Sequence, residues 1–117
     1  SRHPNYVVKC LLKSLIKLME AHIEGSDAVI TLKGARTLGQ SEVFTLWAEG
    51  CAALDHVDLS QLHKGVGQLA FFVNLTNLLT LHAAILQAAN IPEDEVSETT
   101  FVPITSPHIH QKALQER

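Results

Sequence analysis

The longest apolar stretch of the chain extends from Gln68 to Gln87, where hydrophobic residues occupy most sides of a helix. It lies within residues 65–92, a run without a charged side chain. A segment this long and this rich in Leu and Ala predicts one buried central helix over about residues 67–90. Residues that favour turns bound it on both sides: Gly65 and Gly67 before it, Asn90 and Pro92 after it.

Two earlier segments show the three–four spacing of amphipathic helices. The first predicts a helix over residues 4–24, with Pro4 at its first position and Gly25 as its C-cap. Its apolar stripe is Val8, Leu11, Leu12, Leu15, Leu18, Met19, His22 and Ile23. The second predicts a helix over residues 42–54, with Ser41 as its N-cap. Its inward side chains are expected to be Val43, Phe44, Leu46, Trp47, Cys51 and Leu54.

The segments between these helices are short. Residues 28–32 are β-branched and predict a small edge strand or an extended connector, and residues 33–36 predict a turn. Asp58 is suited to cap a single helical turn over residues 59–63. The pattern predicts a mainly α fold, a small helical domain with one long buried central helix and at most one short strand. That domain is expected over residues 1–92, and residues 93–117 are expected to form an acidic tail or connector containing Pro and Thr, with a short final helix.

The amino-acid composition narrows the classes of function that the chain can have. The chain has 46% hydrophobic and 18% charged residues and a net charge of −3, so it is expected to be globular. No Lys- or Arg-rich face is present and aromatics are sparse, which argues against nucleic acid as a partner. The central stretch is long enough to span a membrane, but its amides and His82 favour the core helix of a soluble domain. Cys10 and Cys51 are expected to be buried thiols in an intracellular, cytoplasmic protein.

Residues 57–62, Val-Asp-Leu-Ser-Gln-Leu, and residues 69–82, Leu-Ala-Phe-Phe-Val-Asn-Leu-Thr-Asn-Leu-Leu-Thr-Leu-His, carry a resemblance to a known family. Over about residues 5–90 the chain resembles the domain-of-unknown-function family numbered 547. Asn74 and Asn77 match the two asparagines of the family's helix, and His82 matches its trailing histidine. Thr76 replaces the family's aromatic residue between the asparagines. The resemblance implies a module of a multidomain intracellular protein, with a distant relation to papain-like folds.

Asn74, Asn77 and His82 are the candidate ligand-binding residues on the central helix. For the two amides a structural role is preferred, because a buried amide must form hydrogen bonds and can fix the register of its helix. A histidine on an apolar face is also typical of a core. Nucleophilic catalysis needs a Ser or Cys beside the histidine. No Cys lies where a papain-like helix would begin, and the surroundings of Cys51 do not favour a thiolate, so no catalytic residue is predicted.

Metal binding has weak support in the sequence. His108 and His110 would lie on one side of a strand, and His56 and His63 form another loose pair. Two ligands do not make a site, so no metal and no cofactor are expected. Gly65 and Gly67 are expected to supply a turn rather than a phosphate loop, since the third glycine and a preceding strand are missing.

A helix that is apolar on nearly all sides must be covered from more than one direction. The chain does not begin with Met, and we expect it to be a fragment of a larger protein. Sequence outside this fragment, a protein partner or self-association is therefore expected to cover Phe72, Leu79 and Leu86. The sequence favours a non-catalytic structural or protein-interaction module, a scaffold element. The alternative is a degenerate papain-like or hydrolase-like domain that binds a ligand without turning it over, so enzymatic activity is not favoured.

Overall fold

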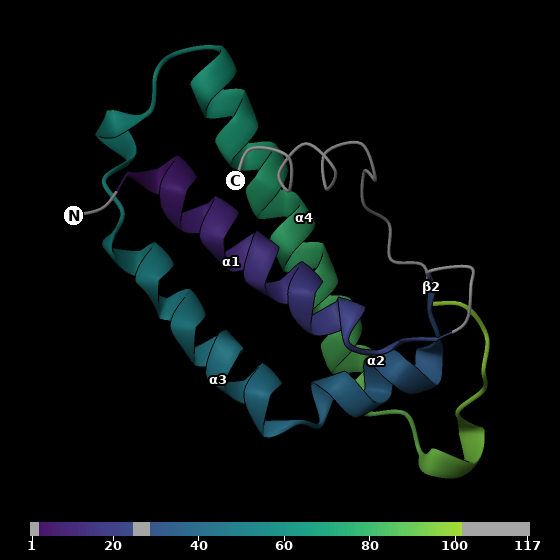
Figure 1. The fold of residues 1–117 in the computed structure, drawn as a ribbon. Helices are drawn as coiled ribbons and strands as arrows, with labels where there is room; N and C mark the ends of the chain where they lie inside the picture. The colour runs from purple at the N-terminus through teal and green to yellow at the C-terminus, as the bar shows by residue number, and fades with distance from the viewer. Residues whose placement is uncertain (1–2, 25–28, 102–117) are drawn as a thin grey trace.

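The computed structural model describes residues 3–24 and 29–101 (Figure 1). The described residues form four α-helices: α1 (Pro4–Glu20), α2 (Leu32–Gly39), α3 (Glu42–Gly50) and α4 (Val66–Ala89). Two short strands, β1 (Ile23–Glu24) and β2 (Val29–Ile30), pair antiparallel with Ile23 opposite Ile30. Three 3₁₀ turns cover Cys51–His56, Leu59–Gln61 and Glu93–Glu95. The mainly α class is confirmed.

Helix α1 begins as its sequence predicts and ends earlier. Pro4 occupies the first turn, and the His3 side chain accepts a hydrogen bond from the Asn5 backbone N–H at 3.2 Å. The helix ends at Glu20 rather than near residue 24, because Ile23 and Glu24 are extended and pair with β2. Cys10 is exposed, so the expectation of a buried thiol there is wrong. It lies on the opposite side of the helix from the buried residues Val8, Leu12 and Leu15.

Helix α2 replaces the turn predicted at residues 33–36. The Thr31 hydroxyl accepts a hydrogen bond from the Gly34 N–H at 3.0 Å and caps the helix. At its other end, Arg36 Nε donates to the Ile91 carbonyl at 2.8 Å and Gln40 Nε2 donates to the Ala89 carbonyl at 2.9 Å. Helix α2 therefore satisfies carbonyl groups at the C-terminal end of α4, where a cation is also favourable.

Helix α3 starts at its predicted N-cap, since the Ser41 hydroxyl accepts from the Phe44 N–H at 3.2 Å. It ends at Gly50, and a 3₁₀ turn follows where the sequence predicts more α-helix. Phe44 and Trp47 are buried as expected, but Val43 and Leu46 are 48% and 57% exposed, so their predicted inward orientation is wrong. In so short a helix only one face meets the core, and Phe44 and Trp47 occupy it.

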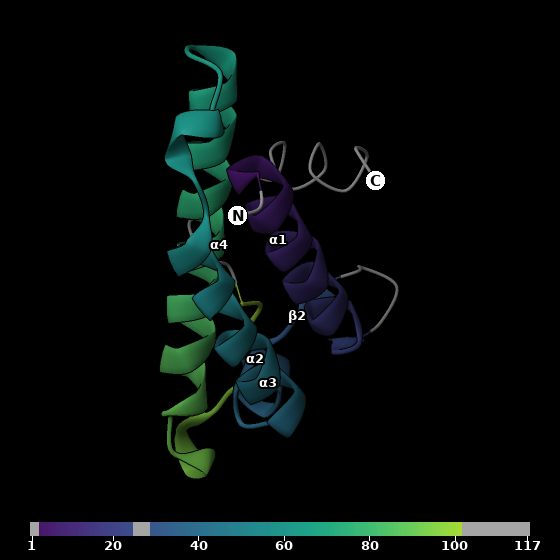
Figure 2. The same cartoon turned by 90° about the vertical axis from the view of Figure 1, so that its left-hand side faces the viewer.

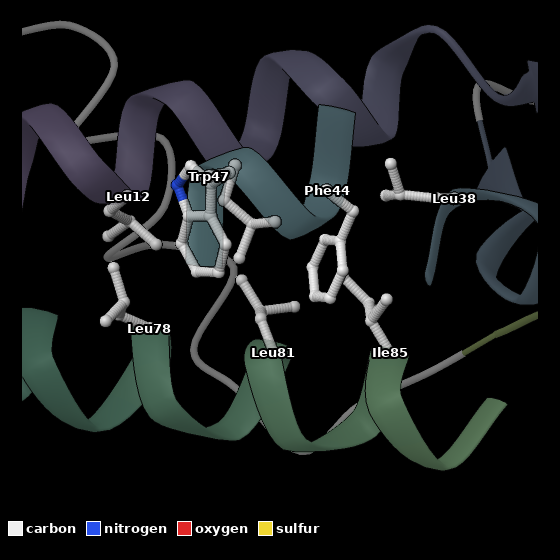
Figure 3. Packing of buried hydrophobic residues seen from close by; sticks show 8 residues of the cluster. Leu12, Leu38, Phe44, Trp47, Leu78, Leu81 and Ile85 are labelled. Carbon is white, nitrogen blue, oxygen red and sulfur yellow. The ribbon is translucent and has the colours of Figure 1, made fainter. Parts of the chain in front are cut away.

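The main core joins α4 to the other helices (Figure 3). Leu78, Leu81 and Ile85 project from α4 toward Phe44 and Trp47 of α3 and Leu12 of α1. The Asn5 side chain links the first turns of α1 and α4, since its Nδ2 donates to the Gly67 carbonyl at 3.2 Å. Farther along, Val8 clusters with Phe71 and Leu12 with Leu78, so the two helices run in the same direction (Figure 1). Figure 2 shows α1 and α2 on one side of α4.

Part of the predicted tail contacts the helical domain. The Leu32 N–H donates to the Thr99 carbonyl at 2.7 Å, and the Phe101 N–H donates to the Ile30 carbonyl at 2.9 Å. Phe101 also packs against the main core. The short final helix predicted beyond these residues, with His108 and His110, lies outside the described residues.

The close approach of α2 to α4 depends on Gly39. A Cβ at this position would lie 2.8 Å from the Ala89 Cβ and 2.8 Å from the Ile85 carbonyl oxygen. Gly39→Ala is therefore expected to lower the free energy of unfolding by about 1–3 kcal/mol, because the two helices must separate. Denaturant unfolding measures this change.

Gly50→Ala is the matched control for Gly39→Ala. No atom lies within 4 Å of a Cβ placed on Gly50. Its backbone is helical, with φ −63° and ψ −23°, so Ala is expected to be neutral or to stabilise by about 0.5–1 kcal/mol. Equal destabilisation by both substitutions would show that contact with α4 is not what requires glycine at residue 39.

Candidate functional site

Asn74 and Asn77 lie on the buried face of α4, at 6% and 5% exposure. They share that face with apolar residues: Phe71, Leu78, Leu81, Ile85 and Ala88. Buried amides on a face that packs against other helices are typical of groups that set the position of one helix against another. Their burial is compatible with the structural interpretation, and it leaves little of either side chain accessible to a ligand.

His82 lies in an aromatic cluster rather than in a polar site. Its ring contacts Phe44 and Trp47 edge to face, with centroids 5.6 and 5.1 Å away. Phe44 and Trp47 are themselves stacked at 5.5 Å, and Trp47 Nε1 donates to the Leu11 carbonyl at 3.0 Å. Burial lowers the pKa of His82 below its ordinary value, since a charged imidazolium would lose solvation there.

The three predicted ligand-binding residues do not line one described pocket. A shallow hollow of about 230 Å³ on α4 is lined by Asn77 with Phe72, Val73 and Thr76, and neither Asn74 nor His82 reaches it. His82 follows Asn74 by eight positions, which places the two residues ~12 Å apart along the helix axis. Of the three side chains only Asn77 lines this hollow, so the hollow does not match a single small ligand held by all three.

The side of α4 away from this core carries a regular row of exposed residues. Phe72, Leu79 and Leu86, the predicted interface, are 51%, 52% and 44% exposed. The row continues at spacings of three and four residues, and we call it the outer stripe: Leu69, Phe72, Thr76, Leu79, Ala83 and Leu86, all exposed. The sequence analysis identified three members seven residues apart, Phe72, Leu79 and Leu86. It missed the other three, Leu69, Thr76 and Ala83. Testing the outward face for the three–four spacing would have found them.

The surroundings of Cys51 do not favour a nucleophilic thiolate. Burial raises the pKa of the Cys51 thiol, so less of it is thiolate at neutral pH. His56 and His63 are exposed. Within residues 3–24 and 29–101, no group of three or more His, Cys, Asp or Glu side chains is arranged to hold a metal ion.

Helix α4 is long and apolar enough to cross a membrane by length and composition, with mean hydropathy 1.7 over its most apolar window. A core helix of a soluble protein passes the same test, but such a helix is mostly buried. In α4 only 33% of the window is buried. The helix therefore buries an inner face and leaves an apolar outer face accessible.

Searches for related proteins give no family. No protein-family model, no curated protein and no solved structure matches the chain. The resemblance to the family numbered 547 therefore stays an expectation from the sequence.

Stability is expected to depend on the titration of His82. Its pKa in the folded protein lies below the unfolded value of about 6.5, so the unfolded chain takes up the proton first as the pH falls. The stability that neutral His82 contributes is fully present above about pH 6.5, the unfolded pKa, and is lost as the pH falls toward the lower pKa of the folded protein. His82→Phe keeps a ring against Phe44 and Trp47 and should show a smaller fall in unfolding free energy between about pH 7 and 5. A steeper fall in the variant would mean that the imidazolium is favoured by the aromatic rings.

The buried amides give a second prediction. Asn74→Ala and Asn77→Ala are each expected to lower the unfolding free energy by about 1–3 kcal/mol, as losses of buried polar contacts. Gln68→Ala, which removes an exposed amide from the same helix, should change it by less than about 0.5 kcal/mol. Wild-type denaturant midpoints in both Asn variants would contradict the structural role.

Proposed function

We propose that this chain is a non-catalytic interaction module of an intracellular protein, and that the outer stripe of α4 is its docking surface. The observation that carries this proposal is the exposure of Leu69, Phe72, Leu79 and Leu86 on one helix face, at 44–66%. A contiguous exposed apolar row is typical of a protein interaction surface rather than of scattered surface residues.

The outer stripe has the composition of a surface that can lose contact with water. No residue of α4 carries Lys, Arg, Asp or Glu, so burying the face desolvates no such charge. The polar member, Thr76, donates its hydroxyl proton to the Phe72 carbonyl at 2.7 Å. Because this donor is already satisfied within the helix, contact with an apolar partner would not leave it without an acceptor.

The alternative function, ligand binding through Asn74, Asn77 and His82, has weaker support. The two amides are buried, and the histidine is packed against aromatic rings. A ligand at these positions would have to displace core contacts. The outer stripe needs no such rearrangement, so the docking function is preferred.

Leu79→Glu tests the docking surface at the middle of the stripe. Leu79 is 52% exposed, so the substitution should leave the fold intact and abolish stripe-dependent behaviour. The measurements are sedimentation and binding of a hydrophobic dye, with circular dichroism to check the fold. We expect wild type to self-associate or bind dye, and Leu79→Glu to lose either property by about tenfold, the equivalent of 1.4 kcal/mol.

Leu46→Glu is the matched control, because Leu46 is an equally exposed leucine on α3, at 57%. It should behave as wild type in both measurements. A wild-type monomer that binds no dye, unchanged by Leu79→Glu, would contradict the docking function. Leu79-dependent binding to lipid vesicles without protein association would assign the stripe to a membrane surface and also contradict it.

A further inference from the structure

We propose that the partner of the outer stripe is a second copy of this chain, packed antiparallel along α4; this inference rests on the proposed function. The six stripe residues are separated alternately by three and four positions. This spacing lets a helix pack lengthwise against another helix that has the same repeat. A second α4 supplies that repeat without any further sequence.

One antiparallel register uses every member of the stripe. With the two-fold axis between residues 77 and 78, Leu69 meets Leu86, Phe72 meets Ala83, and Thr76 meets Leu79 of the other copy. Because the arrangement is symmetric, each of these contacts occurs twice. The largest side chain of the stripe lies opposite the smallest, which lets the helices approach closely along the whole contact.

The charges at the two ends of α4 favour the antiparallel orientation. Lys64 is exposed two residues before the first residue of α4, and the acidic residues Glu93, Asp94 and Glu95 are exposed after its end. In an antiparallel pair each Lys64 lies near the acidic turn of the other copy. A parallel pair would instead place the two acidic turns together. Such exposed charges add little affinity, but they select orientation.

The contact is large enough for reversible association. Helix α4 has 24 residues and is therefore ~36 Å long. Pairing along this length buries on the order of 600 Å² per protomer, at the lower limit of specific interfaces. We therefore expect a dimer that dissociates on dilution.

A substitution swap tests the register. Ala83→Phe places a second large ring against Phe72 and should weaken dimerisation by about tenfold or more, measured by sedimentation equilibrium. The double variant Phe72→Ala with Ala83→Phe again places one large and one small side chain at each contact between residues 72 and 83. It should restore the association constant to near the wild-type value. Failure of the double variant to recover, with folding intact by circular dichroism, would overturn this register.

Cysteine cross-linking tests the orientation. In a Cys10→Ser, Cys51→Ala background that still dimerises, an equimolar mixture of Leu69→Cys and Leu86→Cys chains should form disulfide-linked heterodimers on mild oxidation. The two sites lie ~25 Å apart within one chain, so a parallel dimer cannot form this link. Efficient homodimer formation by Leu69→Cys alone would overturn the antiparallel arrangement.

The two proposals fail in different ways. A wild-type chain that stays monomeric at all accessible concentrations, yet binds dye in a Leu79-dependent way, would overturn the dimer and leave the docking surface in place. A monomer without dye binding would overturn both.

Discussion

The structure depends on how α4 is covered. This helix carries large apolar side chains on both sides, and the other described helices pack against only one of them. Helix α1 runs alongside it, α3 contributes Phe44 and Trp47 to the shared core, and α2 closes against its C-terminal half. Fully burying one large apolar side chain is worth about 1.5–3 kcal/mol. The inner face is therefore a main source of stability, and the outer face, which these helices leave exposed, is the surface on which the proposed docking function rests.

The N-terminal boundaries of several helical segments could be predicted because local chemistry determines them. Pro4, Ser41 and Asp58 each act at the N-terminal boundary where the sequence places them. Gly65 adopts φ +81° immediately before α4, in the region of backbone conformation that favours glycine. These interactions involve neighbours within a few residues, so no knowledge of the tertiary structure is needed to find them.

The features that could not be predicted depend on distant contacts. Gly34 and Gly39 have low helix propensity and suggest a turn, yet both lie in α2. At Gly39 the close approach of α4 leaves no room for a side chain. Val43 and Leu46 are as apolar as Phe44 and Trp47, and only packing against α1 and α4 decides which pair is buried. The outer stripe shows the same division. The sequence singled out Phe72, Leu79 and Leu86, which are exposed, but not the other stripe members between and before them.

On α4 the buried and exposed positions are occupied in the opposite way from what a monomeric small domain would favour. It buries two amides and leaves five large apolar side chains between 44% and 82% exposed. Exchanging the two kinds of residue would reduce exposed apolar surface and remove polar groups that must be satisfied internally. This arrangement is expected if the amides position α4 against its neighbours and the outer face is covered in an assembly. The inner and outer faces then have separate roles, one in folding and one in association, which is why substitutions on the outer stripe can report on association without disturbing the core.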